Sequence, residues 1–265
     1  MPYAINGRVR IYWEEEGQGD PLLMIMGLGF SLAMWRELRA CMAQHFRTIV
    51  YDNRGVGRSD VLLWPYSIAT MARDAVSVLN AAGAPSAHVL GFSMGGMIAQ
   101  ELALSSPNRV RGLVLGCTSC GGRRSVHAEP EVRRALFPRP FAPREKIIAG
   151  LLPFIYDDQT ARDRIEQDLQ ILRRNPTPRF GFLEQLLAIL SWQSYDRLPR
   201  ITAPTLVIHG ANDRLIPPAN ARILAERIPG AKLVVLPCAS HIFPTDQPER
   251  SRQELLNFLT ASPAT

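Results

Sequence analysis

The sequence has 265 residues, of which 46% are hydrophobic and 20% charged, a composition typical of a globular protein with a sizeable core. The net charge is +6, but basic and acidic residues are interleaved along the chain, which argues against a nucleic-acid-binding stripe. No apolar run approaches the roughly 18 residues that a membrane span needs, and the N-terminus lacks the layout of a signal peptide. We therefore expect a cytoplasmic protein that binds neither nucleic acid nor membrane.

The four cysteines do not follow a metal-binding pattern. Cys117 and Cys120 make one C-x-x-C, without a second cysteine pair or a histidine pair at zinc spacing. We expect all four to pack as small apolar side chains in a reducing compartment. The sequence thus predicts no metal site.

The first third of the chain predicts a β-hairpin followed by alternating strands and helices. Asn6-Gly7 is a type I′ turn signal between two short strand-like segments. Residues 22–26 form a continuous apolar run, which is typical of a strand buried on both faces of a parallel sheet. The next expected elements are helices over 34–44 and 67–82 and a strand over 47–51.

Residues 87–106 predict a strand, a sharp turn and a helix, with Ser93 at the turn. The sequence Gly91-Phe92-Ser93-Met94-Gly95 has the G-x-S-x-G pattern of a nucleophile elbow, in which a strained turn raises the serine hydroxyl above the sheet. Gly91 and Gly95 supply room there, because side chains at these positions would collide with the turn. Ser93 is the candidate nucleophile, and the alternative is a serine in an ordinary strand–helix turn.

The pattern changes after a strand expected over 110–116. From about residue 120 to 196 strand signals vanish, prolines recur, and helices are expected over 143–152, 160–174 and 179–192. We interpret residues 120–196 as a helical cap inserted into a core made of residues 1–119 and 197–265.

The alternation of strands and helices returns after Pro204. Strands are expected over 205–209 and 232–236, and helices over 217–228 and 248–260. This order predicts an α/β fold, with a mostly parallel central sheet and helices on both faces.

A catalytic serine needs a base and an acid that orients the base. His241 follows the last strand, at the edge where parallel sheets carry their sites, and His209 at the end of the preceding strand is the alternative. Asp213 leaves the end of that same preceding strand, so it can meet His241. Asp246 is a second candidate acid, although its position favours capping the last helix.

Two backbone N–H groups are candidates for an oxyanion hole. One belongs to Met94, the residue after the candidate nucleophile, and the other to Leu28 in the glycine-rich turn after the strand over 22–26. An ordinary strand–helix turn is the alternative for the Leu28 segment.

Together these motifs resemble the α/β-hydrolase superfamily over almost the full length of the chain. The resemblance implies that Ser93 is the nucleophile, His241 the general base and then acid, and Asp213 the orienting carboxylate. One departure is Met26-Gly27, where many relatives have His-Gly. In those relatives the histidine holds the oxyanion loop by hydrogen bonds, which methionine cannot make. The motifs that carry the resemblance are Gly91-Phe92-Ser93-Met94-Gly95-Gly96, the loop over 52–59, Gly210 with Asp213, and His241.

The reaction implied is hydrolysis of a carboxylic ester through an acyl-enzyme, without a metal or another cofactor. The substrate is expected to be a small ester or lactone with an apolar part. Apolar residues near the catalytic loops or in the insertion are the pocket candidates: Phe30, Trp35, Phe92, Trp192, Leu215 and Ile242.

Three alternative functions share this pattern. The segment over 28–35 looks like the corresponding loop of 3-oxoadipate enol-lactonases, and cofactor-free perhydrolases share the Gly-Phe-Ser-Met-Gly-Gly elbow. A ligand-binding receptor on the same fold, with slow turnover, is the alternative that is not primarily an enzyme.

Overall fold

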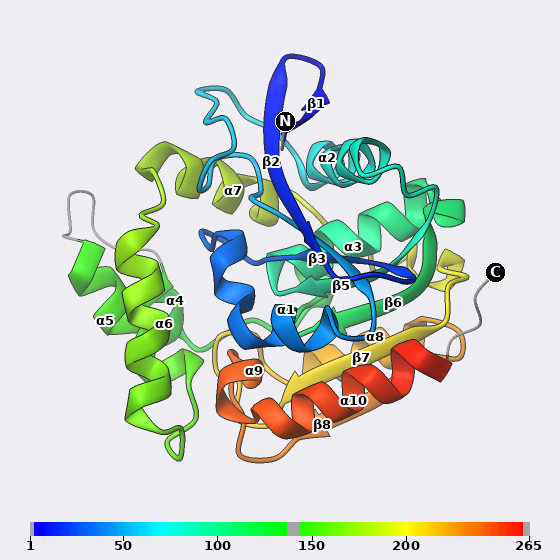
Figure 1. Cartoon of the computed structure of the whole chain (residues 1–265). Coiled ribbons are helices and arrows are strands. Elements are labelled where there is room, and N and C mark those ends of the chain that lie inside the picture. The colour runs from blue at the N-terminus through cyan, green and yellow to red at the C-terminus, as the bar shows by residue number, and fades with distance from the viewer. Residues whose placement is uncertain (1–2, 137–143, 262–265) are drawn as a thin grey trace.

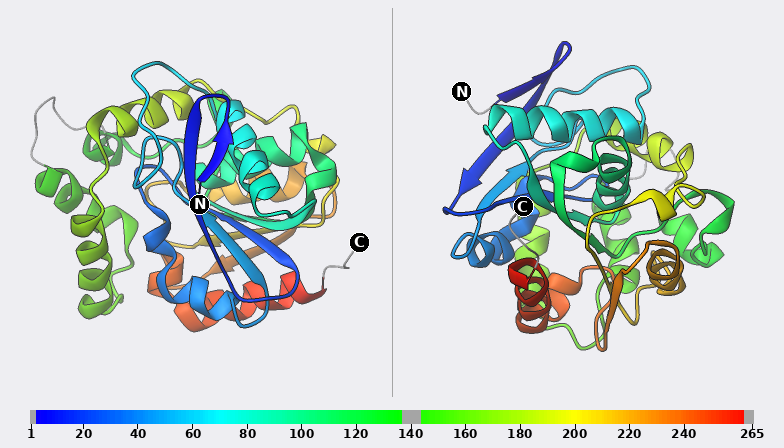
Figure 2. Two further views of the ribbon diagram at one scale, coloured as in Figure 1. Left: turned by 45° about the horizontal axis from the view of Figure 1, so that its top comes forward. Right: turned by 90° about the vertical axis from the view of Figure 1, so that its right-hand side faces the viewer.

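The computed structural model describes residues 3–136 and 144–261. A sheet of eight strands runs through the centre, in the order β1-β2-β4-β3-β5-β6-β7-β8, with helices on both faces (Figures 1 and 2). The pairs β1–β2 and β2–β4 are antiparallel, and the remaining pairs are parallel, as the sequence predicts. The strands are β1 (Tyr3–Asn6), β2 (Val9–Glu16), β3 (Pro21–Ile25), β4 (Arg47–Tyr51), β5 (Ala87–Phe92), β6 (Val110–Gly116), β7 (Thr205–Gly210) and β8 (Lys232–Leu236).

The first hairpin turns one residue later than predicted. Asn6 pairs with Val9, so the turn consists of Gly7 and Arg8. Gly7 has φ 64°, a conformation that glycine adopts at little cost. Glycine at the first turn position is the type II′ pattern, so the predicted type I′ turn at Asn6-Gly7 is wrong.

Alternation along the strands divides the core into two layers. In β3, Leu23 and Ile25 pack with the helices α2 and α3, whereas Leu22 and Met24 pack with α1 and α10. Because the strand is apolar at every position, both faces of the sheet are covered. The helices of the two layers are α1 (Arg36–Met42), α2 (Ile68–Ala81), α3 (Met94–Ser105), α8 (Ala219–Arg227), α9 (Phe243–Asp246) and α10 (Pro248–Ala261), with short 3₁₀ helices at Leu32–Trp35, Pro107–Arg109 and Leu198–Arg200.

In the described residues, four α-helices and two short 3₁₀ helices separate β6 from β7. The helices α4, α5 and α6 lie on the side toward which the arrow of β7 points (Figure 1). One of them, α4, is absent from the sequence prediction, and Pro143, where we expected a helix to begin, lies outside the described residues. In the described ranges no helix has both the length and the apolarity to cross a membrane. The elements are Gly122–Arg124 (3₁₀), α4 (Pro130–Leu136), α5 (Arg144–Ile155), α6 (Arg162–Arg174), α7 (Arg179–Leu190) and Leu198–Arg200 (3₁₀).

A buried ion pair connects the loop after β4 to α2. Arg54 donates from Nε and Nη2 to the two carboxylate oxygens of Asp74, each at 2.6 Å, and both side chains are almost fully buried. Asn6 of the hairpin donates to the same carboxylate at 2.7 Å. The guanidinium also lies over the ring of Tyr66, 5.1 Å from its centre. This ion pair therefore joins three segments that are distant in the sequence.

Replacing Asp74 with asparagine leaves the Arg54 guanidinium buried without its counter-charge. We expect the free energy of unfolding to fall by about 3 kcal/mol. The matched control is Glu166→Gln in the exposed pair with Arg173, which we expect to cost less than about 1 kcal/mol. Urea unfolding at pH 7 measures both, and equal losses in the two variants would contradict the importance of the buried pair.

Candidate active site

Ser93 occupies a strained turn between β5 and α3. Its φ of 55° and ψ of −120° place a non-glycine residue in a sparsely populated region. The Ser93 N–H donates to the carbonyl of Gly116 at 2.8 Å, and the Thr118 hydroxyl donates to the Ser93 carbonyl at 2.7 Å. These bonds to β6 and the segment after it hold the turn in place.

Glycines around Ser93 permit backbone segments to touch. A Cβ atom on Gly91 would lie 2.4 Å from the carbonyl oxygen of Gly95. A Cβ atom on Gly95 would lie 2.0 Å from the carbonyl oxygen of Ile25, at the end of β3. The collision expected from the sequence is therefore present at both positions.

The structure brings Ser93, His241 and Asp213 together from three separate loops. Nε2 of His241 lies 3.1 Å from Oγ of Ser93, and Nδ1 lies 2.8 Å from Oδ2 of Asp213. The imidazole is buried against the ring of Phe92, with ring centres 5.2 Å apart. Ser93 itself is partly exposed. A carboxylate, an imidazole and a hydroxyl thus lie in one hydrogen-bonded row.

The carboxylate fixes the tautomer of His241. A carboxylate accepts hydrogen bonds only, so Nδ1 carries the proton and Nε2 faces Ser93 with a free lone pair. Asp213 also accepts the N–H groups of Leu215 and Ile216, at 2.9 and 2.8 Å. Burial alone raises the pKa of Asp213, but His241 and His209 beside it outweigh burial and hold that pKa well below its usual range. The carboxylate is therefore charged at neutral pH.

His209, the alternative base, contacts Asp213 and the loop after β7. Its Nε2 is 2.7 Å from the carbonyl of Ile216 and 3.1 Å from Oδ2 of Asp213. Both partners are acceptors, so Nε2 carries a proton and His209 supports the carboxylate.

Cys117, His209 and Asp213 bring ligand-type atoms within 4.8 Å of one another. Burial raises the pKa of the Cys117 thiol well above its usual value, which opposes the thiolate form that metals require. Asp213 is already occupied by hydrogen bonds from His241 and from the loop after β7. We therefore interpret this cluster as support for Asp213. All four cysteines are free thiols.

The two candidate oxyanion donors flank Ser93. Met94 is the first residue of α3, so its N–H has no acceptor within the helix. On the other side, a Cβ atom on Gly27 would lie 3.0 Å from Cβ of Ser93, so the loop that carries Leu28 runs directly against the serine. Met94 therefore follows Ser93 at the start of α3, and the loop before Leu28 packs against Ser93 at Gly27.

Side chains far along the sequence hold this loop. The Asn53 amide donates to the carbonyl of Met26 at 2.9 Å. Gln185 of α7 accepts the Gly29 N–H at 2.9 Å and donates to the carbonyl of Arg54 at 2.9 Å, and it is fully buried. These bonds anchor the loop in a chain that lacks the usual histidine at position 26. Sequence reasoning missed both side chains, because a single buried glutamine on a helix has no distinctive pattern.

Asp246 links the segment before His241 to the turn between α5 and α6. It accepts hydrogen bonds from the Ser240 N–H at 2.7 Å, the Thr160 hydroxyl at 2.6 Å and the Asp157 N–H at 3.3 Å. The residue before α10 is Gln247, so the expectation that Asp246 caps that helix is wrong. Burial, reinforced by the nearby Asp157 charge, raises the pKa of Asp246 to about 6 against the effect of these hydrogen bonds.

A small apolar cavity of about 20 Å³ is lined by Phe92 and Ile242, the chain neighbours of Ser93 and His241. Of the predicted pocket residues, four line it and two do not. Trp192 lies in the core instead, where its indole N–H donates to Glu101 at 2.8 Å, and Leu215 packs against the α1–α10 layer. The lining residues are Met26, Phe30, Met34, Trp35, Leu38, Phe92, Ile242, Pro244 and Thr245.

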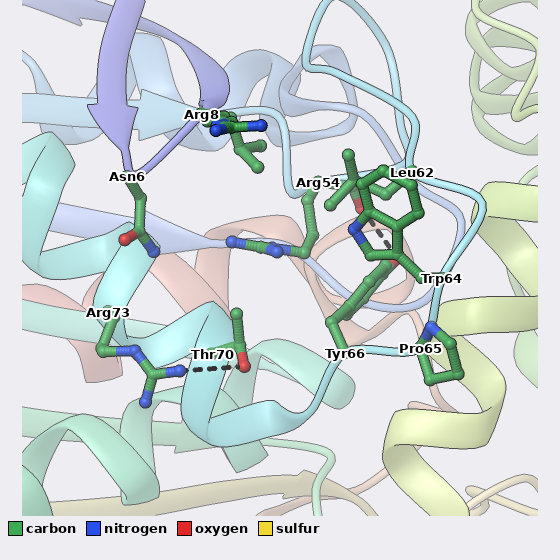
Figure 3. A pocket seen from close by; sticks show the side chains of 10 residues that line it. Asn6, Arg8, Arg54, Leu62, Trp64, Pro65, Tyr66, Thr70 and Arg73 are labelled. Carbon is green, nitrogen blue, oxygen red and sulfur yellow. Dashed lines mark hydrogen bonds between the residues drawn. The ribbon is translucent and has the colours of Figure 1, made fainter.

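A larger cavity of about 350 Å³ lies away from Ser93, between the first hairpin and the start of α2 (Figure 3). None of the predicted site residues lines it. Its arginines have structural partners in part, since Arg54 pairs with Asp74 and Arg73 donates to Thr70 at 3.1 Å.

The mostly parallel sheet, with G-x-S-x-G between β5 and α3, defines an α/β hydrolase. The chain belongs to the family described as "Serine aminopeptidase, S33", which matches residues 27–248.

Named relatives agree with this assignment. The chain is 32% identical to "Putative carbamate hydrolase RutD" of Azorhizobium caulinodans, over 97% of this chain and 98% of the relative. It is 30% identical to the pimeloyl-[acyl-carrier protein] methyl ester esterase of Aeromonas hydrophila, over 86% and 91%. The crystal structure of the enol-lactonase from Burkholderia xenovorans superposes with a TM-score of 0.88, at 27% identity, over 98% and 100%. These relationships identify a hydrolase.

The buried carboxyl of Asp246 gives stability a specific dependence on pH. Its folded pKa of about 6 lies above its ordinary value of 3.8, so the folded protein holds a proton there that the unfolded chain has lost. Its contribution is therefore fully present below about pH 4 and is lost as the pH rises through 6. Between pH 4.5 and 7.5 this loss is about 2 kcal/mol.

Urea unfolding of the wild type and Asp246→Asn at both pH values measures the effect. The free energy of unfolding of the wild type minus that of Asp246→Asn is expected to be about 2 kcal/mol smaller at pH 7.5 than at pH 4.5. Other titrating groups contribute equally to the two proteins and cancel in this difference. Parallel pH profiles for the two proteins would show that Asp246 does not titrate in this range.

Proposed function

We propose that this protein is a serine hydrolase that cleaves a carboxylic ester through an acyl-enzyme on Ser93. The observation that carries the proposal is the 3.1 Å separation between Nε2 of His241 and Oγ of Ser93. A serine hydroxyl is a weak nucleophile until a base removes its proton as it attacks, and this nitrogen has the free lone pair to do so. Asp213 stabilises the imidazolium that results.

Acylation begins when Oγ of Ser93 bonds to the ester carbonyl carbon and its proton passes to Nε2 of His241. The carbonyl oxygen becomes negatively charged between the N–H groups of Met94 and Leu28. Each such donor is worth about 3–4 kcal/mol in the transition state. His241 then gives its proton to the departing alkoxide, and the alcohol leaves.

Deacylation repeats these steps with water. His241 takes a proton from the water as it attacks the acyl carbon, and the same two N–H groups hold the oxyanion. The bond to Oγ then breaks, Ser93 regains its proton from His241, and the free acid departs. No step requires a metal or an organic cofactor.

The apolar cavity supports an apolar group in the substrate, but at about 20 Å³ it has room for little more than a water molecule. We infer that residues 120–196 act as a cap, and that the part containing α5 moves to admit the substrate while α7 stays in place. The carbonyl of Ile155 in α5 accepts the N–H of Ile242, the residue after the candidate base, at 2.9 Å. Movement of this segment would therefore open the side of the site that carries His241.

A small lactone is the second substrate class, favoured by the likeness to an enol-lactonase. Opening a lactone breaks the same acyl–oxygen bond, except that the leaving alcohol stays attached to the acyl group. The carbamate and methyl ester named for the other relatives also contain a carbonyl open to the same attack. These relatives support carbonyl hydrolysis by this chain.

Ser93→Ala removes the nucleophile while leaving the turn intact. We expect kcat/KM for a short-chain p-nitrophenyl ester to fall by about four orders of magnitude or more. A fluorophosphonate probe should add one covalent adduct to the wild type, on the peptide that contains Ser93, and none to the variant. Mass spectrometry measures this directly.

The control is Ser125→Ala, because Ser125 makes only a local bond to Gly122. It should retain full activity and labelling. Undiminished turnover in Ser93→Ala would exclude the proposed mechanism, whereas tight ligand binding by a wild type that does not turn over would favour the receptor alternative.

Gln185→Leu removes the side chain that anchors the oxyanion loop at Gly29. We expect kcat to fall roughly ten- to hundredfold with little change in KM, because a displaced Leu28 N–H weakens binding of the oxyanion.

The matched control is Gln100→Leu, since Gln100 is also fully buried and hydrogen-bonded through both amide atoms, to Ser119 and Ser194. Both variants should lose similar thermal stability, but only Gln185→Leu should lose kcat. Equal kcat values for the two would argue that Gln185 acts on stability alone.

A further inference from the structure

The helix α7 has two very different faces. Its inward face is buried and includes Gln185, which holds the oxyanion loop. Its outward face is a row of large apolar side chains with no role in the core, which we call the α7 stripe. The stripe consists of Phe180, Leu183, Leu187 and Leu190, whose exposed fractions are 60%, 48%, 44% and 60%.

The spacing within the α7 stripe is that of a helix-pairing seam. Its members are three, four and three residues apart, which is the a–d repeat of a coiled coil. Helices that only cover a core carry such a seam on the inside and charged residues on the outside. Here the seam lies on the outside, which indicates that another surface covers it.

The exposed area suits a protein interface. At about 200 Å² for each whole side chain, the α7 stripe offers roughly 400 Å² of apolar surface. An interface of standard size buries about 800 Å² on each partner, and a little over half of that area is apolar. The α7 stripe therefore supplies most of the apolar area that one partner of such an interface buries.

The neighbouring loop extends this surface. The loop before α2 lies beside α7 in all views, and the Tyr66 hydroxyl lies 3.5 Å from the carbonyl of Gly181 (Figures 1 and 2). In that loop Leu63 and Trp64 are also largely exposed. A partner on the α7 stripe would therefore find further apolar contacts at the edge.

We propose that a second copy of this chain covers the α7 stripe, with the two α7 helices antiparallel about a twofold axis near Gln185. The stripe is symmetric about that position, so the axis sets Phe180 against Leu190 of the second copy, and Leu183 against its Leu187. A twofold interface requires such self-complementarity, because each patch must match itself. Any other partner would need an unrelated seam of the same spacing.

Analytical ultracentrifugation of the full chain tests the association. The wild type should sediment as a dimer at tens of micromolar, and Leu187→Glu should weaken the dimer at least a hundredfold, because it places a charge in the centre of the seam. The matched control is Leu233→Glu on the edge strand β8, another partly exposed leucine, which should leave the dimer intact.

Cysteine cross-linking tests the orientation. Mixing Leu183→Cys with Leu187→Cys should give a disulfide-linked heterodimer under mild oxidation, whereas each variant alone should give much less. Efficient linking of each variant to itself would indicate parallel helices and would overturn the proposed axis.

Three outcomes overturn the proposal. One is a wild type that remains monomeric at these concentrations. Another is a dimer that Leu233→Glu dissociates and Leu187→Glu does not, which would place the contact at β8. A third is a monomeric wild type that co-sediments with phosphatidylcholine vesicles when Leu187→Glu does not, which would assign the stripe to a lipid surface.

Discussion

The contact between the end of β3 and the first turn of α3 is the constraint on which the site depends. Gly95 lies so close to the carbonyl of Ile25 that any side chain there would overlap it. The same turn holds Ser93 at a positive φ, a conformation that non-glycine residues rarely adopt. The loop after β3 also runs against the serine at Gly27, so the end of β3 packs against both sides of the Ser93 turn.

Two buried carboxylates near His241 illustrate how surroundings decide protonation. Asp213 faces the imidazoles of His241 and His209, which together hold its pKa low despite complete burial. Asp246 faces another carboxylate, Asp157, and burial prevails, so its pKa rises to about 6. The same residue type thus serves as a charged partner of His241 and as a titrating link to the helical insertion.

The helix α7 connects the insertion to the chemistry on one side and to solvent on the other. Gln185 reaches across to Gly29 and to the carbonyl of Arg54, and Gly181 packs so tightly on Gly55 that neither could carry a side chain. A contact on the outward face of α7 would therefore bear on an element that also holds the oxyanion loop. The proposed dimer and the proposed reaction meet in this helix, although each rests on separate observations.

The sequence by itself determined the α/β fold, the succession of most elements and the turn at Ser93, because these follow from local apolar periodicity and from glycines at fixed offsets. It also nominated Asp213 and His241 from their places after neighbouring strands. It missed α4, shifted the first hairpin turn by one residue, and placed Trp192 in a pocket when its indole N–H bonds to Glu101 in the core.

Only the tertiary structure decided what Gln185, Asn53 and Asp246 do. Gln185 lies 156 positions from Gly29, whose N–H donates to it, and nothing in the residues around either one signals the contact. The outward direction of the α7 stripe was equally hidden, because a periodic apolar row on a helix reads the same whether it faces the core or solvent. Local patterns encode elements, whereas the partner of a buried polar group depends on which distant segments the fold brings together.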